Sequence, residues 1–139
     1  MVGDYSFQFL MEEVAVAAQY RVPFVLVMVN NTNLGLIRQA ERGGYDMRFG
    51  IDLGFGENDQ GVDFVKAMQA MGGDGRAVTR PEELRSAFAW AVETSNSIEA
   101  PVLVEVRTEK DNLVAMGPSL DRIIESHPLP EVPVASTAR

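Results

Sequence analysis

The stretch VPFVLVMVNN, residues 22–31, decides the fold of this chain. Its hydrophobicity is continuous rather than alternating, which is typical of a strand buried on both faces of a parallel sheet. Pro23 falls at the start of the run, where the missing N–H of proline costs little. The stretch PVLVEV, residues 101–106, is the last expected strand. We therefore expect a parallel sheet in which both runs are strands.

Helical patterns lie between the expected strands. Apolar residues after Ser6 recur at the spacing of one helix face, so Ser6 is the expected N-cap of the first helix. Thr79 and Glu82 form a capping box at the start of the last helix. The alternation of strands and helices predicts an α/β fold, a three-layer parallel sheet with helices on both faces. The expected helices cover residues 7–18, 34–42, 61–71 and 79–95, and short strands are expected at 1–2 and 76–79.

The composition restricts the partners. A formal net charge of −8 over 139 residues argues against a nucleic-acid-binding protein, whose binding surface is usually basic. The longest apolar run, residues 22–29, is too short to cross a bilayer, and the N-terminus lacks the pattern of a signal peptide. The absence of cysteine fits a reducing compartment. We therefore expect a cytoplasmic protein with neither nucleic acid nor a membrane as its partner.

Two polar corners follow expected strands. Gly3-Asp4 comes directly after Met1-Val2, and Asn30-Asn31 comes directly after the strand of residues 22–29. Parallel sheets bind ligands beyond the carboxyl ends of their strands, so both corners lie at the ligand-binding edge. Taken singly, each corner is also an ordinary turn. Only their shared position at one edge favours a binding site.

The residue types at these corners suit a metal-bound diphosphate. The carboxylate of Asp4 and the amide oxygen of Asn31 are hard ligands of the kind that Mg²⁺ prefers, and the turn after Asn31 could add a main-chain carbonyl, most simply that of Asn33. The amides of Tyr5 and Ser6 open a helix, and a helix N-terminus attracts anions. One cation beside one helix start is the pairing that holds a diphosphate.

The paired corners resemble the diphosphate-binding motif of thiamine diphosphate enzymes, in which GDG is followed by NN. The resemblance implies that Asp4, Asn31 and the carbonyl of Asn33 hold Mg²⁺, which bridges to the cofactor. It also implies a set of residues that approach the diphosphate: Gly3, Asp4, Tyr5, Ser6, Asn31, Asn33, Leu34 and Gly35. The sequence departs from the general motif at Tyr5, which stands at the third position, where the motif has its second glycine.

Further stretches narrow the resemblance. Tyr5 followed by SFQFLMEE, together with VNNTNLGLIRQAERG at 29–43, GVDFVKAMQAMG at 61–72 and NLVAMGPSLD at 112–121, is similar to the glyoxylate carboligase (tartronate-semialdehyde synthase) branch of the acetolactate-synthase-like group. This implies condensation of two glyoxylates to tartronate semialdehyde with release of CO₂. A fragment of acetolactate synthase or of another 2-oxo-acid decarboxylase or carboligase is the first alternative. A non-catalytic subunit or remnant domain is the second.

The resemblance covers residues 1–125 and implies a domain organisation. We expect a C-terminal diphosphate- and Mg-binding domain that is truncated at its N-terminus, followed by a Pro-rich, mobile tail over residues 126–139. In the family, a second domain, usually of a neighbouring subunit, holds the aminopyrimidine, and a middle domain in this group carries FAD. The chain alone is therefore expected to be inactive, and the complete enzyme is expected to be a homo-oligomer acting on a small 2-oxo acid. No catalytic residue is assigned from the sequence.

Overall fold

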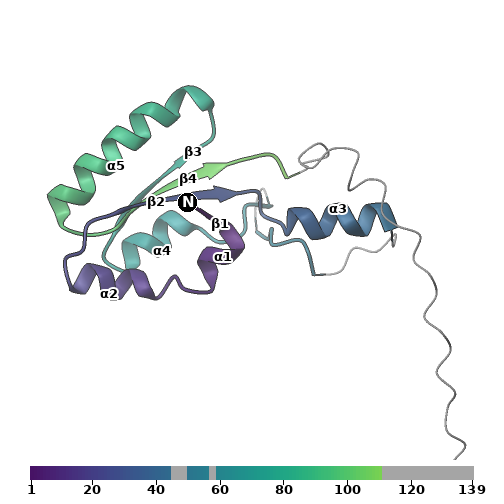
Figure 1. The fold of residues 1–139 in the computed structure, drawn as a ribbon, viewed down its shortest axis with the longest axis horizontal. Coiled ribbons are helices and arrows are strands. Elements are labelled where there is room, and N and C mark those ends of the chain that lie inside the picture. The colour runs from purple at the N-terminus through teal and green to yellow at the C-terminus, as the bar shows by residue number, and fades with distance from the viewer. Residues whose placement is uncertain (45–49, 57–58, 111–139) are drawn as a thin grey trace, which may run out of the picture.

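The four strands form one parallel sheet, as the sequence predicts (Figure 1). The computed structural model describes residues 1–44, 50–56 and 59–110. The strand order is β1-β2-β4-β3, and every neighbouring pair is parallel. The strands are β1 (Val2–Gly3), β2 (Val25–Asn30), β3 (Asp74–Val78) and β4 (Val102–Arg107). The expected tail at 126–139 and the stretch 112–121 lie outside the described residues.

Helices cover both faces of the sheet, which confirms the three-layer α/β fold. The helices α1, α2 and α4 lie on one side in Figure 1, and α5 lies on the other. Each side has its own buried core. The helical segments are α1 (Asp4–Gln8), α2 (Glu13–Gln19), α3 (Gly35–Gly44), α4 (Phe64–Ala70), the 3₁₀ turn η2 (Pro81–Glu83) and α5 (Leu84–Ile98).

The side chains of β4 explain why its hydrophobicity is continuous. Leu103 belongs to the core beneath α1, α2 and α4, whereas Val102 and Val104 belong to the core beneath α5. Successive side chains of a strand point to opposite faces, so a strand covered on both sides has consecutive apolar residues, here Val102, Leu103 and Val104. β2 meets this expectation only in part: Val25 and Val27 stay half-exposed because α5 packs chiefly on β3 and β4.

The first helix differs from its prediction. A single helix from Phe7, capped by Ser6, was expected, but α1 already begins at Asp4 and ends at Gln8. A separate helix, α2, follows after a short break. Phe7 and Val14 are both buried, yet Leu10 between them is 65% exposed. One continuous helix would place all three on the same face, so the break is what turns Leu10 outward.

The other boundaries differ at the ends of elements. The predicted capping box is wrong: η2 precedes α5, neither has a side-chain cap, and Arg80 pairs instead with Glu83. The remaining differences shift element ends. β2 begins at Val25, so Pro23 lies before the strand and not in it, and the strand ends at Asn30. α3 continues through Gly44, α4 begins at Phe64 behind an Asp63 cap, β3 begins at Asp74, and α5 reaches Ile98. Within the described residues, no helix combines the length and the hydrophobicity needed to cross a membrane.

Candidate functional site

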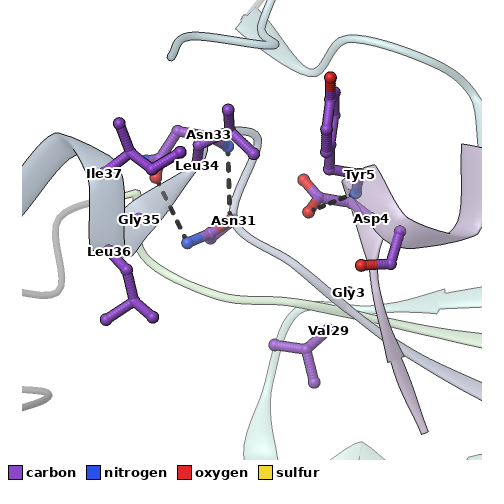
Figure 2. A pocket seen from close by; sticks show the side chains of 11 residues that line it. Gly3, Asp4, Tyr5, Val29, Asn31, Asn33, Leu34, Gly35, Leu36 and Ile37 are labelled. Carbon is purple, nitrogen blue, oxygen red and sulfur yellow. Dashed lines mark hydrogen bonds between the residues drawn. The ribbon is translucent and has the colours of Figure 1, made fainter.

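A pocket of about 490 Å³ opens at the carboxyl ends of β1 and β2 (Figure 2). The register places Gly3 beside Val29, so the two polar corners emerge next to one another. Every residue that the sequence analysis assigned to the cofactor lines this single pocket. The full lining is Gly3, Asp4, Tyr5, Ser6, Val29, Asn31, Asn33, Leu34, Gly35, Leu36 and Ile37.

Asp4 brings a buried negative charge to the pocket. Its side chain is almost fully buried, and Oδ1 accepts a hydrogen bond of 2.9 Å from the N–H of Tyr5. Burial raises the pKa of the Asp4 carboxyl, the backbone N–H groups of Tyr5 and Thr32 partly oppose the shift, and the negative charge of Glu105 adds to it. In the part of the chain that the structure describes, no Lys or Arg forms an ion pair with Asp4.

Asn31 lies across the pocket from Asp4. In Figure 2 the Asp4 carboxylate points toward the Asn31–Asn33 turn, and the Asn31 amide is turned toward Asn33. Asn31 Oδ1 accepts the N–H of Asn33 at 3.4 Å, and Asn31 Nδ2 lies 3.5 Å from Asn33 Oδ1. Asn33 is buried and donates from Nδ2 to the carbonyl of Lys110 at 2.5 Å. The two corners therefore bring one carboxylate and one amide to the same pocket from the ends of separate strands.

The turn holds a strained residue at its centre. Thr32 has φ of +53°, a left-handed conformation that a β-branched residue seldom adopts. Its N–H donates to Asn30 Oδ1 at 2.9 Å, and its carbonyl accepts the N–H of Leu53 at 2.9 Å. Strained backbone of this kind persists only where surrounding bonds enforce it, and it concentrates at functional sites.

Two helices, α1 and α3, begin at the pocket, and they differ in the backbone N–H groups that they offer to an anion. The N–H of Tyr5 was expected to approach a phosphate, but it is engaged by the carboxylate of Asp4. The ring of Tyr5 packs edge-on against Phe9, with centroids 5.1 Å apart. The longer helix α3 begins at Gly35 in the pocket lining, so its N-terminal amides and dipole lie at the site.

Three apolar residues of the pocket were missed: Val29, Leu36 and Ile37. Leu36 and Ile37 are half-exposed at the start of α3, and Val29 is the last apolar residue before Asn30. The sequence signal that could have identified Leu36 and Ile37 is an adjacent apolar pair in the first turn of a helix, where a pair cannot both face a core. They give the pocket an apolar wall opposite its polar corner.

A tether, formed by Lys110 and one backbone hydrogen bond, holds Ile51, Asp52 and Asp59 against the Asn31–Asn33 turn. Lys110 Nζ lies 2.6 Å from Asp52 Oδ1 and also pairs with Asp59. The backbone adds a hydrogen bond of 2.9 Å from Leu34 N–H to the carbonyl of Ile51. The hydrogen bond from Lys110 lowers the pKa of Asp52, with a smaller contribution from the charge of Arg38, and the two aspartates raise the pKa of Lys110.

The stability that this tether contributes is expected to be lost in acid. Because the folded pKa of Asp52 is lowered, the contribution is present above the ordinary aspartate pKa of about 3.9 and disappears as the pH falls through the lowered value. The Asp52 side chain is 53% exposed, so we expect the pair to contribute no more than about 1 kcal/mol. Denaturant titrations of the wild type and Asp52→Asn should differ at pH 6 and converge in acid. A difference independent of pH would contradict this assignment.

Comparison with known proteins gives a consistent result. Residues 1–106 match the family described as "Thiamine pyrophosphate enzyme, C-terminal TPP binding domain". The chain is 40% identical over 129 residues to glyoxylate carboligase of Escherichia coli O157:H7, covering 88% of this chain and 22% of that protein. It is 31% identical over 130 residues to the mitochondrial acetolactate synthase catalytic subunit of Saccharomyces cerevisiae, covering 91% of this chain and 18% of that protein.

Solved structures show the same similarity. The thiamine diphosphate-dependent 4-hydroxybenzoylformate decarboxylase of Rhodococcus jostii RHA1 superposes with a TM-score of 0.66 at 31% identity, over 79% of this chain and 19% of that one. Benzoylformate decarboxylase from Polynucleobacter necessarius superposes with a TM-score of 0.65 at 25% identity, over the same shares. The chain thus spans about a fifth of the length of the proteins that it matches.

Proposed function

Because the chain belongs to the thiamine pyrophosphate enzyme family, as a C-terminal TPP-binding domain, we propose that the pocket of Figure 2 binds the diphosphate of the cofactor through Mg²⁺. The observation that carries this proposal is the placement of Asp4 and Asn31 on opposite sides of one pocket. Carboxylate and amide oxygens together are a donor set that suits Mg²⁺, which retains its remaining positions for water and phosphate.

The residues present fit the group. Asp4 is a buried carboxylate without a cationic partner in the described part of the chain, a costly arrangement that a divalent ion would offset. Gly3 has an extended backbone that any residue adopts, with φ of −83°, and an added Cβ would meet no heavy atom within 4 Å. Neither backbone nor packing of the described residues requires glycine there, so the space beside it is available to a bound molecule.

Each residue then has a proposed role. Asp4 and Asn31 bind Mg²⁺, and the main-chain carbonyl of Asn33 completes the protein ligands. Ser6 and the Asn33-Leu34-Gly35 turn approach the diphosphate, supported by the positive end of the α3 dipole. When bound, thiamine diphosphate supplies an electron sink for the carbon–carbon bond chemistry of 2-oxo acids. The chain's own part is to bind and orient the phosphate end.

We base the proposed reaction on glyoxylate carboligase, to which the chain has the highest identity of the proteins reported above. We propose the condensation of two glyoxylates to tartronate semialdehyde, supported by the 40% identity to glyoxylate carboligase. Acetolactate synthase and other 2-oxo-acid decarboxylases are the alternative, which the similarity to the yeast synthase and to the Rhodococcus decarboxylase supports. No residue of this chain is assigned a catalytic role.

A partner completes the site in this proposal. Residues 1–125 form the diphosphate-binding domain, and a pyrimidine-binding domain or subunit outside these residues supplies the rest. The assembled enzyme is a homo-oligomer, with FAD held elsewhere. The chain covers only 22% of the carboligase that it matches, which supports this division. We expect no carboligation by the isolated chain with thiamine diphosphate and Mg²⁺. Turnover by the chain alone would overturn the need for a partner.

The binding itself is tested by calorimetry. We expect the wild-type chain to bind thiamine diphosphate with Mg²⁺ present and to lose that binding in EDTA, because the diphosphate contact is routed through the metal. Unphosphorylated thiamine is the matched control and should not bind in either condition. Absence of binding with Mg²⁺ would favour the remnant-domain alternative, and binding that ignores Mg²⁺ would contradict the assigned ligands.

A further inference from the structure

A carboxylate lies fully buried in the sheet next to the pocket. Glu105 of β4 has no exposed surface, and it pairs in register with Met28 of β2 and Ala77 of β3. A buried carboxylate is unfavourable unless its oxygens are paired. Here they are paired: Arg107 Nε lies 3.1 Å from Oε1, and the Asn30 side chain donates to the same oxygen at 2.7 Å. The sheet keeps this charge at the carboxyl end of its strands, beside the predicted metal site.

The hydrogen bonds lead from Glu105 to the Asn31–Asn33 turn in two steps. Asn30 Nδ2 donates to Glu105, and Asn30 Oδ1 accepts the N–H of Thr32 at 2.9 Å. A carboxylate only accepts and a backbone N–H only donates, so Asn30 has one possible amide orientation. The amide of Asn30 thus couples Glu105 directly to the strained backbone of Thr32.

The geometry of β2 connects this pair to the pocket. Neighbouring side chains leave a strand on opposite faces, so Asn30 points to the α4 side of the sheet, where it reaches Glu105, while Asn31 lines the pocket across from Asp4. Thr32 lies between Asn31 and Asn33, and its left-handed φ sets the direction in which the chain leaves the strand. Any change at Asn30 would therefore move the residues on both sides of Thr32.

We propose that Glu105, acting through Asn30, is a positioning residue that holds the Asn31–Asn33 turn in its metal-binding conformation. This inference rests on the proposed function of the pocket. Arg107 supports Glu105 by neutralising its carboxylate: Arg107 Nη2 lies 3.4 Å from Glu105 Oε2. If Glu105 only joined β2 to β4, its replacement would lower the stability of the fold without a separate effect on cofactor affinity.

Four variants separate these roles. Glu105→Leu removes the acceptor for Asn30, Glu105→Gln keeps an acceptor oxygen in the same place, and Leu103→Ala damages the same face of the same strand away from the pocket. Asn30→Ala cuts the same link while leaving Glu105 paired with Arg107, and serves if Glu105→Leu does not fold. Each is measured for melting temperature, for Mg²⁺-dependent thiamine diphosphate affinity, and for amide exchange at Thr32.

The expected result is specific to the link. Glu105→Leu and Asn30→Ala should weaken the affinity by about 10- to 100-fold, the usual effect of losing a partner that orients a metal ligand, and should speed exchange at Thr32. Glu105→Gln should restore most of the affinity. Leu103→Ala should lower the melting temperature with the affinity unchanged.

Other outcomes overturn the inference. An unchanged cofactor affinity in Glu105→Leu or Asn30→Ala would overturn it. An equal loss of affinity in Glu105→Gln and Glu105→Leu would do the same. So would a loss of affinity in Leu103→Ala in proportion to its loss of stability. A wild-type chain that binds no cofactor would instead overturn the proposed function. In that case the amide exchange of Thr32, compared without ligand between the wild type and Glu105→Leu, decides whether Glu105 orders the Asn31–Asn33 turn.

Discussion

Replacing Asp4 with asparagine is expected to abolish Mg²⁺-dependent binding of thiamine diphosphate while raising the melting temperature of the metal-free chain. The carboxylate is 5% exposed, its pKa is raised by burial, and no described Lys or Arg pairs with it. Asparagine keeps the shape and still offers an oxygen to the N–H of Tyr5. Removing the buried charge should therefore stabilise the folded chain by on the order of 1 kcal/mol.

The loss of affinity should be larger than any other in the pocket. A metal ligand contributes directly, and even the partners that orient ligands cost about 10- to 100-fold when removed, so we expect more than about 100-fold for Asp4→Asn. Opposite effects on binding and on stability are the mark of a residue kept for function.

Asp74→Asn is the matched control for this experiment. Asp74 Oδ1 also accepts the N–H of the following residue, Gly75, at 2.8 Å, and it lies at the start of β3, away from the pocket. Calorimetry should show unchanged cofactor binding for Asp74→Asn. Retained Mg²⁺-dependent binding in Asp4→Asn would contradict its assignment as a ligand, and a lowered melting temperature would contradict the argument from burial.

Truncating Phe7 to alanine is expected to cost about 3–5 kcal/mol, a large share of the 5–15 kcal/mol that stabilises a typical domain. Phe7 is 4% exposed, and its ring packs edge-on against the buried ring of Phe64 at 5.8 Å. It lies three residues after Asp4 in the same helix, so this contact is what fixes α1 against the sheet. We expect cofactor affinity to fall together with stability.

Phe9→Ala gives the comparison for Phe7→Ala. Phe9 directly follows α1 but is 66% exposed, and its described aromatic contact is the ring of Tyr5. Its truncation should change the free energy of unfolding by no more than about 0.5 kcal/mol. Denaturant titrations of both variants measure the difference. Similar losses for the two would show that the core beneath α1 does not set the position of Asp4.

The elements that were predicted well depend on short stretches of sequence. The valine-rich stretches 22–29 and 101–106 indicated strands of a parallel sheet, and β2 and β4 lie there as parallel neighbours. The failures share one cause. The break after α1, the missing capping box and the exposure of Leu10 all depend on how a segment meets the sheet, and local periodicity carries no information about that contact.

The sequence by itself determined the class of fold and the residues of the corner that is proposed to bind the cofactor. Asp4 and Asn31 each follow a strand directly, and strands that run parallel end at one edge, so the corner needs no knowledge of distant contacts. Only the tertiary structure decided what supports that corner. The strand order places β4 beside β2, which brings Glu105 to Asn30 across 75 positions of the chain. A buried carboxylate gains its partners from neighbouring strands, and the order of those strands is set by the packing of the whole sheet.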